Sequence, residues 1–271
     1  MRSPRGIVRV PYWLPAGVGV TLTIALAIAA SGAAPLTRWL GPHPGSEAAI
    51  ERDADSASAV WRRAVRLIAA ERRVPVDEAL IGAEVGPLVT TLGEIEAKRV
   101  SASPAWPAAF VRDFHRAGLR EGDVVAAAFS GSFPALNLAV ASAAQAMGIR
   151  LVAVSSVTAS SWGATEPGFT WPEIEVRLVR AGILESASAA ISAGGGLDRA
   201  ADLDEEGRAL ARAIAARCAA ELRGVLLEPA GFDEAVSARL EVFDTARGRA
   251  PLAAFVNVGG TEAALGRSTA I

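Results

Sequence analysis

The chain has 271 residues, a hydrophobic content of 51% and a formal net charge of -2. This composition indicates a packed globular protein, and the absence of a basic stretch suited to phosphate backbones argues against a nucleic-acid partner. Cys218 is the only cysteine, so no disulfide can form within the chain, and we expect it to be a small core residue.

The N-terminal segment predicts a membrane anchor. Residues 1–9 form a basic tail with three arginines, and residues 10–37 carry no charge. A run of that length can cross a hydrocarbon core of about 30 Å. The arginines before it favour a cytoplasmic N-terminus in the cell membrane, with a single pass and the main domain outside the cytoplasm. The alternative is a cleaved signal peptide, because residues 27–29 and 31–33 resemble small-residue cleavage sites.

Residues 38–45 predict a linker, and residues 46–271 alternate amphipathic and short apolar segments. We expect helices over residues 46–73, 76–83, 105–117, 134–147, 172–180, 203–223 and 232–247. We expect strands over residues 124–129, 151–154, 187–193 and 252–258. This alternation predicts an α/β fold with one Rossmann-like parallel sheet. We expect residues 261–271 to be a poorly packed partial helix, in a product that is incomplete relative to its relatives.

A strand, a small polar loop and a helix start follow one another over residues 122–137. Pro134 suits the first helical turn, because its missing N–H would have no partner there. Ser130, Gly131 and Ser132 are therefore expected at the carboxyl end of a strand, beside a helix N-terminus that favours anions. The alternative is an ordinary tight turn in which the serines act as local caps.

Serine, glycine and asparagine also follow the other predicted strands. Loops after parallel strands emerge at one edge of a sheet, where ligands bind. We therefore expect a pocket for a polar or anionic group, to which the loops contribute Ser130, Gly131, Ser132, Asn137, Gly194, Gly195, Asp198, Asn257 and Gly259.

Signatures of cofactors are missing from the sequence. Residues 194–196 lack the spacing of a dinucleotide fingerprint, and no phosphate-binding loop with lysine occurs, so we predict no nucleotide cofactor. Two histidines and one cysteine disfavour a transition-metal site. A carboxylate-bound Mg²⁺ or Ca²⁺ at Asp198 with Glu173 or Glu175 stays open.

The signatures of serine hydrolases are also incomplete. Ser132 has the place of a nucleophile at a strand-to-helix turn, but the surrounding Gly-x-Ser-x-Gly pattern is absent. A Ser-His-Asp triad would need His115 to come across the fold, because the only other histidine, His43, lies in the linker.

Residues 130–137 resemble a segment of the bacterial poly-gamma-glutamate system protein family, as do residues 90–99, 163–165, 169–171, 193–198 and 256–260 in the same order. The resemblance implies a membrane-associated component of poly-γ-glutamate production, and it implies no particular reaction. Because residues 90–99 take part in the resemblance, it also implies that Lys98 and Arg99 contact the carboxylates of a polyanion, for which they are natural partners. The alternative for Lys98 is a helix-face ion pair with Glu94.

Two functions follow as expectations. The first is an extracytoplasmic accessory component of poly-γ-glutamate synthesis or export, which binds the polymer or its synthase and export proteins. The second is an anchored α/β hydrolase or transferase that acts on a glutamyl or cell-wall peptide. A base within hydrogen-bond reach of Ser130 or Ser132 would favour the enzyme, whereas a groove lined only by amides and hydroxyls would favour binding.

Overall fold

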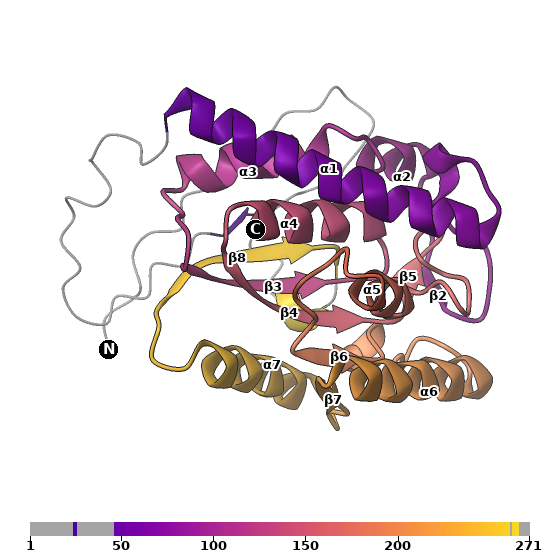
Figure 1. Cartoon of the computed structure of the whole chain (residues 1–271). Helices are drawn as coiled ribbons and strands as arrows, with labels where there is room; N and C mark the ends of the chain where they lie inside the picture. The colour runs from indigo at the N-terminus through magenta and orange to yellow at the C-terminus, as the bar shows by residue number, and fades with distance from the viewer. Residues whose placement is uncertain (1–23, 26–45, 261, 266–271) are drawn as a thin grey trace.

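The computed structural model describes residues 24–25, 46–260 and 262–265. Its main sheet has six strands in the order β1-β8-β3-β4-β6-β7 (Figure 1). The strands are β1 (Ile24–Ala25), β3 (Val124–Phe129), β4 (Arg150–Ser156), β6 (Ala190–Ser192), β7 (Val225–Leu227) and β8 (Leu252–Val258). All pairs are parallel except β1 with β8. The predicted α/β fold with a Rossmann-like parallel sheet is confirmed.

Helices cover both faces of this sheet. On one face lie α1 (Glu47–Arg72), α3 (Trp106–Arg116) and α4 (Pro134–Ala146), which pack against one another. On the other face lie α6 (Glu205–Leu222) and α7 (Phe232–Arg247). The helix α5 (Trp171–Arg180) packs against β4 and α6. This sandwich explains why β3 is apolar at every position: each of its residues is buried.

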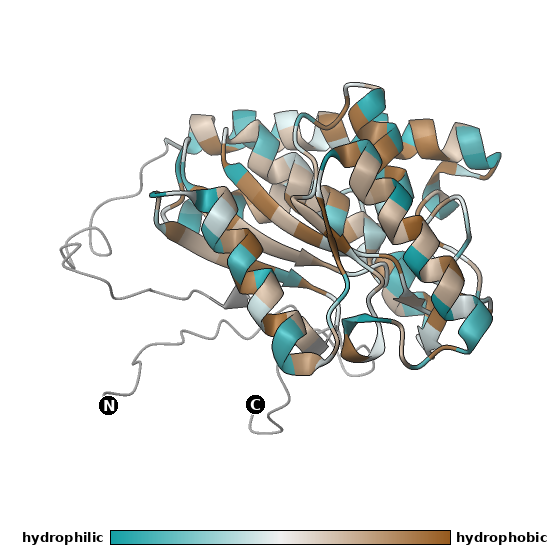
Figure 2. Ribbon diagram, turned by 90° about the horizontal axis from the view of Figure 1, so that it is seen from below, coloured by the Kyte–Doolittle hydropathy of each residue, from teal (hydrophilic) through white to brown (hydrophobic). Residues whose placement is uncertain are grey.

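Alternate residues of β3 serve the two faces. Val125 and Phe129 belong to the cluster with α1, α3 and α4, whereas Val124 and Ala126 belong to the cluster that includes Phe243 of α7. Figure 2 shows the corresponding apolar band along the central strands. The period of two is the one that a strand imposes on its side chains.

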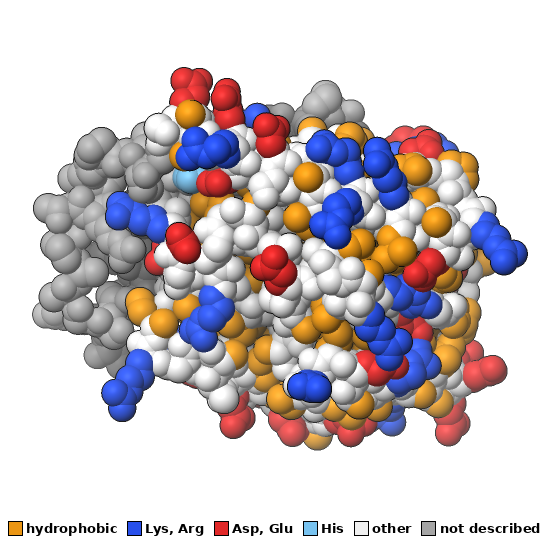
Figure 3. All heavy atoms as spheres, in the orientation of Figure 1, with side chains coloured by type: hydrophobic (Ala, Val, Ile, Leu, Met, Phe, Trp, Pro, Cys, Tyr) orange, Lys and Arg blue, Asp and Glu red, His pale blue; other side chains and the backbone are white. Residues whose placement is uncertain are grey.

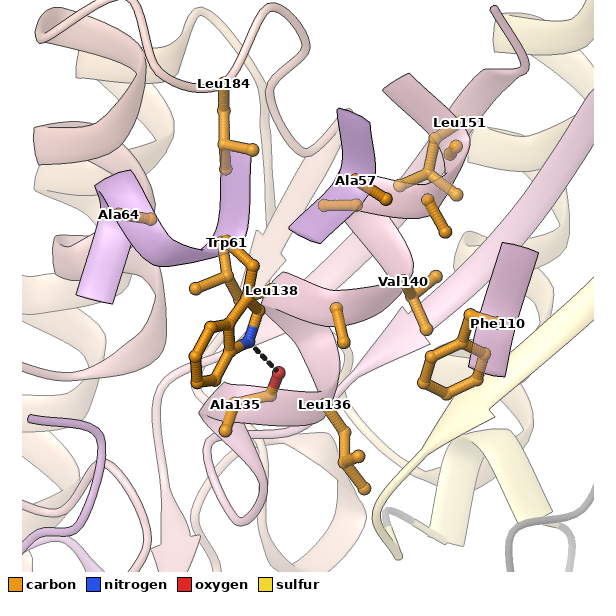
Figure 4. Close-up of a cluster of buried hydrophobic side chains, with 14 of the residues drawn as sticks. Ala57, Trp61, Ala64, Phe110, Ala135, Leu136, Leu138, Val140, Leu151 and Leu184 are labelled. Atoms are coloured by element: carbon orange, nitrogen blue, oxygen red, sulfur yellow. Dashed lines mark hydrogen bonds between the residues drawn. The ribbon is translucent and has the colours of Figure 1, made fainter. Parts of the chain in front are cut away.

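The contact between α1 and α4 uses small residues around one large one. Ala57, Trp61 and Ala64 of α1 face α4 in Figure 4. The Trp61 Nε1 donates a hydrogen bond of 3.4 Å to the carbonyl oxygen of Ala135. Since the alanines allow the helix backbones to approach, the indole fills the remaining space and finds a polar partner at the start of α4. This packing fixes the helix that follows the serine loop.

Several short elements differ from the sequence prediction. The segment after residue 76 is a single 3-10 turn, η2 (Val76–Glu78), and the predicted strand 187–193 is paired only over β6. A two-stranded parallel sheet of β2 (Val89–Thr91) and β5 (Ala159–Ser160), the helix α2 (Ile95–Ser101) and the turn η3 (Gly196–Asp198) were not predicted. These elements are too short to carry a period in the sequence, and tertiary contacts form them.

The predicted basic tail (1–9), the predicted anchor (10–37) and the linker (38–45) lie outside the described residues, apart from Ile24–Ala25. These two residues form β1 on the free edge of β8, where the prediction was helical, because an edge strand offers unpaired backbone groups. Within the part of the chain that is described, no helix combines the length and hydropathy needed to span a bilayer. Of the predicted C-terminal partial helix, only α8 (Glu262–Leu265) is described.

Candidate functional site

The order of the strands marks one edge of the sheet as a site for ligands. The chain runs from β3 outward through β4, β6 and β7, and then returns to place β8 on the opposite side of β3. The loops after β3 and β8 therefore begin from adjacent strands, at the point where the order reverses. In Figure 1 the arrowheads of β3, β4 and β8 point towards the region of β2 and β5.

A cavity of about 330 Å³ opens at this edge. Its walls come from β2 and from the loops that follow β3, β4, β6 and β8. The lining residues are Thr90, Thr91, Ser130, Ser132, Phe133, Thr158, Ser160, Gly195, Gly196, Asp202 and Gly260. Serine, threonine and glycine are nine of these eleven residues. We call it the serine cavity.

Three of the residues that the sequence predicted for a pocket line the serine cavity: Ser130, Ser132 and Gly195. The Ser132 N–H donates to Ser130 Oγ at 3.0 Å, and the Ser160 N–H donates to Ser132 Oγ at 3.0 Å. The Ser130 N–H is bonded to the carbonyl oxygen of Val258 at the end of β8. These bonds tie the loops after β3, β4 and β8 into one wall.

Five of the other predicted residues lie outside the lining and shape the wall from behind. A Cβ on Gly131 would lie 2.8 Å from the carbonyl oxygen of Thr158, and one on Gly259 would lie 2.5 Å from Ser130 Cβ. Close approach of two backbones therefore requires glycine at position 131, and position 259 requires it because its φ is +98° and the Ser130 side chain is close. The remaining three are Asn137, which donates to the carbonyl oxygen of Ser130 at 2.8 Å, Asn257, which donates to that of Gly259 at 2.9 Å, and Gly194, which abuts Ser156.

Asp198 lies away from the serine cavity, beside another one of about 200 Å³. Its two carboxylate oxygens accept hydrogen bonds of 2.7 and 2.8 Å from Arg239, and Ser192 Oγ donates to it at 2.7 Å. All three side chains are buried. The arrangement is a satisfied internal ion pair that joins β6 and η3 to α7.

The predicted cation ligands do not converge. Glu173 closes the N-terminal capping box of α5 and pairs with Arg217, whereas Glu175 Oε1 accepts two hydrogen bonds from Ser188. Burial raises the pKa of Glu175 to about 7. Over the described residues, no group of three or more His, Cys, Asp or Glu side chains is arranged to hold a metal ion.

His115 also lies at a different place. Its Nε2 is 2.9 Å from Asp53 Oδ2 of α1, and both residues border a cavity of about 620 Å³ whose lining shares no residue with the serine cavity. The hypothetical triad with Ser132 is therefore not assembled. Cys218 is buried in the cluster around α6, as predicted.

Lys98 approaches the serine cavity from behind. It lies on α2 and is 3% exposed. Its Nζ donates to the carbonyl oxygen of Ser132 at 2.6 Å and to Ser160 Oγ at 2.7 Å, and it lies 3.9 Å from the centre of the Phe133 ring. Burial among neutral oxygens and an aromatic ring lowers the pKa of Lys98 to about 8. Arg99 points elsewhere, and its exposed side chain pairs with Glu96 at 3.3 Å.

The short sheet of β2 and β5 places Lys98 over Ser160. Thr91 of β2 is paired with Ser160, and α2 begins four residues later. A Cβ on Gly93 would lie 2.9 Å from the carbonyl oxygen of Ser161 and 3.3 Å from Ser160 Oγ, so glycine lets the connection pass close to the serine. The chain thus turns against the loop after β4 before α2 starts.

The sequence placed Ser160 in a serine-rich loop after the second predicted strand but not among the predicted site residues, and it gave no role to Thr158. Thr158 Oγ1 is buried and has no hydrogen-bond partner among the atoms that the structure describes, although the residue borders the serine cavity. Ser160 Oγ accepts a hydrogen bond from the Lys98 amine, and its residue lines the cavity. The available signal was the richness in serine and threonine of residues 155–161, which follows a predicted strand.

No protein-family model, curated protein or solved structure matches this chain. Hydroxyls and backbone amides around a cavity suit a carboxylate or another small anion. The buried Lys98 amine contacts the hydroxyl of Ser160, which lines the same cavity, and so adds a candidate base there. Of the two serines that the sequence singled out, it contacts only the backbone oxygen of Ser132 and neither hydroxyl.

Positive and negative side chains are interspersed over the face seen in Figure 3. That face presents no continuous basic stripe, in line with the charge of the whole chain. Recognition of an anionic ligand would then depend on local donors in the cavity, because no broad attractive field arises from mixed charges.

Proposed function

We propose that the serine cavity binds carboxylate groups of γ-linked polyglutamate, in a membrane-anchored component of the synthesis or export of that polymer. The observation that carries the proposal is the Thr158 hydroxyl: its residue lines the cavity, and the oxygen itself is buried and has no partner among the described atoms. Leaving a buried hydroxyl unsatisfied costs about 1–3 kcal/mol. A carboxylate oxygen in the cavity would accept its hydrogen and remove that cost.

Neighbouring hydroxyls support the same ligand. Ser130 Oγ and Ser132 Oγ each accept a backbone N–H, so the hydrogen of each hydroxyl is available for another acceptor. The Lys98 ammonium behind Ser132 and Ser160 adds positive charge near them below about pH 8. These groups favour a bound anion over a neutral amide of the same shape.

The lining of the cavity also includes a negative charge. This charge is on Asp202, whose Oδ1 accepts the Gly196 N–H at 2.9 Å. A chain end that bears both an amino group and a carboxylate would match this polarity better than the middle of a polyanion. The polarity therefore supports recognition of a glutamyl terminus.

Calorimetric titration of the full chain in detergent with γ-linked triglutamate tests the binding. We expect Thr158→Val to weaken binding about tenfold, the equivalent of one lost hydrogen bond to an anion. The same substitution should leave the stability of the free protein unchanged or raised, since it removes an unsatisfied polar group. Ser237→Ala, an exposed serine on α7, is the matched control. Equal binding of the γ-linked analogue in which carboxamides replace the free carboxylates would contradict the proposal.

The anchor belongs to the same proposal and needs its own test. Fractionation of cells should place the full-length protein in the membrane, with the domain open to protease from outside and residues 1–37 protected. A soluble mature form that begins between Ala30 and Pro35 would instead support the signal peptide. Deletion of the gene should reduce the cell's poly-γ-glutamate, and unchanged polymer would contradict the assignment to this pathway.

A further inference from the structure

Binding of a carboxylate in the serine cavity does not by itself explain why Lys98 is buried against Ser160. The amine lies behind the cavity wall, where it does not line the surface that a ligand would touch. Its acceptors are the carbonyl oxygen of Ser132 and Ser160 Oγ, both neutral. Burying a lysine without a carboxylate partner is costly, and such burial is one way in which proteins obtain a neutral amine for chemistry.

We propose that Ser160 Oγ is a nucleophile that takes an acyl group from a γ-glutamyl amide, with the Lys98 amine as its general base. The inference rests on the proposed function for the identity of the acyl donor. The geometry stands by itself: base and hydroxyl are 2.7 Å apart, and the serine faces the cavity while the lysine does not.

The first half of the reaction forms an ester. The neutral Lys98 amine takes the proton of Ser160 Oγ as the oxygen attacks the carbonyl carbon of the amide. The carbonyl electron pair moves onto oxygen and returns as the bond between carbon and nitrogen breaks. The leaving nitrogen takes the proton from the Lys98 ammonium and departs as an amine, which leaves the γ-glutamyl group on Ser160.

The second half releases the acyl group. Water, or the amino group of another glutamyl chain, attacks the ester carbonyl and gives its proton to Lys98. The bond to Ser160 Oγ breaks, and the serine oxygen takes the proton back from the lysine. The net reaction is hydrolysis with water and transfer of the glutamyl group with an amine, and the protein returns to its starting state.

Donors for the developing oxyanion are present in the same wall. Ser132 Oγ accepts the N–H of Ser160 itself, so its own hydrogen is available beside the nucleophile. Thr158, two residues before Ser160, offers a second hydroxyl, which has no partner among the described atoms. Donors that exist before the substrate arrives are the kind that stabilise a transition state most.

A purely structural role for Lys98, as a clamp between α2 and the serine loops, is the competing explanation. A guanidinium could make the same contacts, but it cannot act as a base because it stays protonated. Lys98→Arg therefore separates the two explanations, and Lys98→Met removes both clamp and base. Ser160→Cys provides a third variant, since Cys218 is buried and the new thiol would be the accessible one.

The experiment uses the full chain in detergent with γ-glutamyl p-nitroanilide as the probe. Acid quenching followed by mass spectrometry should show one γ-glutamyl group on the peptide that contains Ser160. Ser160→Ala, Lys98→Met and Lys98→Arg should each lower the release of p-nitroaniline by about 100-fold or more. Ser237→Ala should behave as the wild type. Iodoacetamide should alkylate Ser160→Cys, and Lys98→Met in that background should slow the alkylation.

The outcomes are separable. If Ser160→Ala still releases p-nitroaniline and still forms the γ-glutamyl adduct, the inference is wrong. If Lys98→Arg releases p-nitroaniline at the wild-type rate, Lys98 has only a structural role. If γ-linked triglutamate binds as proposed and no adduct forms, the inference fails while the proposed function stands. If neither binding nor adduct is found, both fail.

Discussion

Two buried cations in this protein have opposite surroundings. Lys98 and Arg239 are each 3% exposed. Arg239 meets both oxygens of Asp198 and also Ser192 Oγ, whereas Lys98 meets two neutral oxygens and the face of Phe133. The arginine is fully compensated and fastens α7 to the sheet. Within the described part of the chain the lysine has no carboxylate partner, and that difference leaves its amine able to lose a proton next to a cavity.

The largest effect should follow from breaking the compensated pair. Arg239→Met leaves the Asp198 carboxylate buried and unpaired, and we expect a loss of about 3–5 kcal/mol in the free energy of unfolding. Urea denaturation followed by circular dichroism measures it. The double variant Asp198→Asn/Arg239→Met removes both charges and should recover part of the loss. A loss as small as that of an exposed ion pair would show that the pair is not structural.

The next effect comes from the wall that holds Ser160 against Lys98. In Gly131→Ala the new Cβ would meet the carbonyl oxygens of Val157 and Thr158 at 2.9 and 2.8 Å, so the segment leading to Ser160 must shift. We expect a loss of about 1–3 kcal/mol in unfolding free energy and weaker binding of γ-linked triglutamate. Gly86→Ala is the control, because its nearest neighbour would lie at 3.9 Å. If Gly131→Ala and Gly86→Ala lower the unfolding free energy equally, the close contact between Gly131 and the segment after β4 is not as the structure shows it.

Lys98→Met should change stability less than Arg239→Met, and the change should depend on pH. The pKa of Lys98 is lowered to about 8 in the folded state from 10.5, so between these values the unfolded state binds more protons. The stability of the wild type relative to Lys98→Met should therefore rise as pH increases from about 8 to 10.5. Urea midpoints of both proteins across this range test the sign, and a falling difference would contradict the buried environment.

Arg99→Gln should have the smallest effect. Arg99 and Glu96 form an exposed ion pair within one helix, and such pairs contribute little because water screens both charges. We expect no measurable change in the urea midpoint or in the binding of γ-linked triglutamate. A clear loss of binding would place Arg99 in the contact with the polymer, as the family resemblance suggested, and would weaken the distinction drawn for its neighbour Lys98.

The larger elements could be predicted from the sequence because each has a local signal. The apolar run of β3, Pro134 at the start of α4 and the glycines after the strands placed Ser130 and Ser132 at one edge of a parallel sheet. The serines then proved to share a cavity with Gly195. Periodicity and turn residues are sufficient for this much.

The contact between Lys98 and Ser160 had no such signal. It depends on the three-residue strand β2, the two-residue strand β5 and a glycine that lets their connection pass. Asp198 was instead predicted as a residue that binds a ligand, because it follows a run of glycines. Its actual partner, Arg239, lies on a helix and is 41 residues further along the chain. Pairings over such separations are invisible to local patterns.

The central claim is that Lys98 is held as a buried amine with no opposite charge beside it among the described residues. It is the only lysine in the chain, so the full-length protein made with lysine labelled with ¹³C at the ε-carbon should give a single lysine signal. The account predicts that this signal titrates with a midpoint near 8 and that Ser160→Ala still titrates well below an exposed lysine, since burial is the cause. A midpoint at the ordinary value of 10.5 would contradict it.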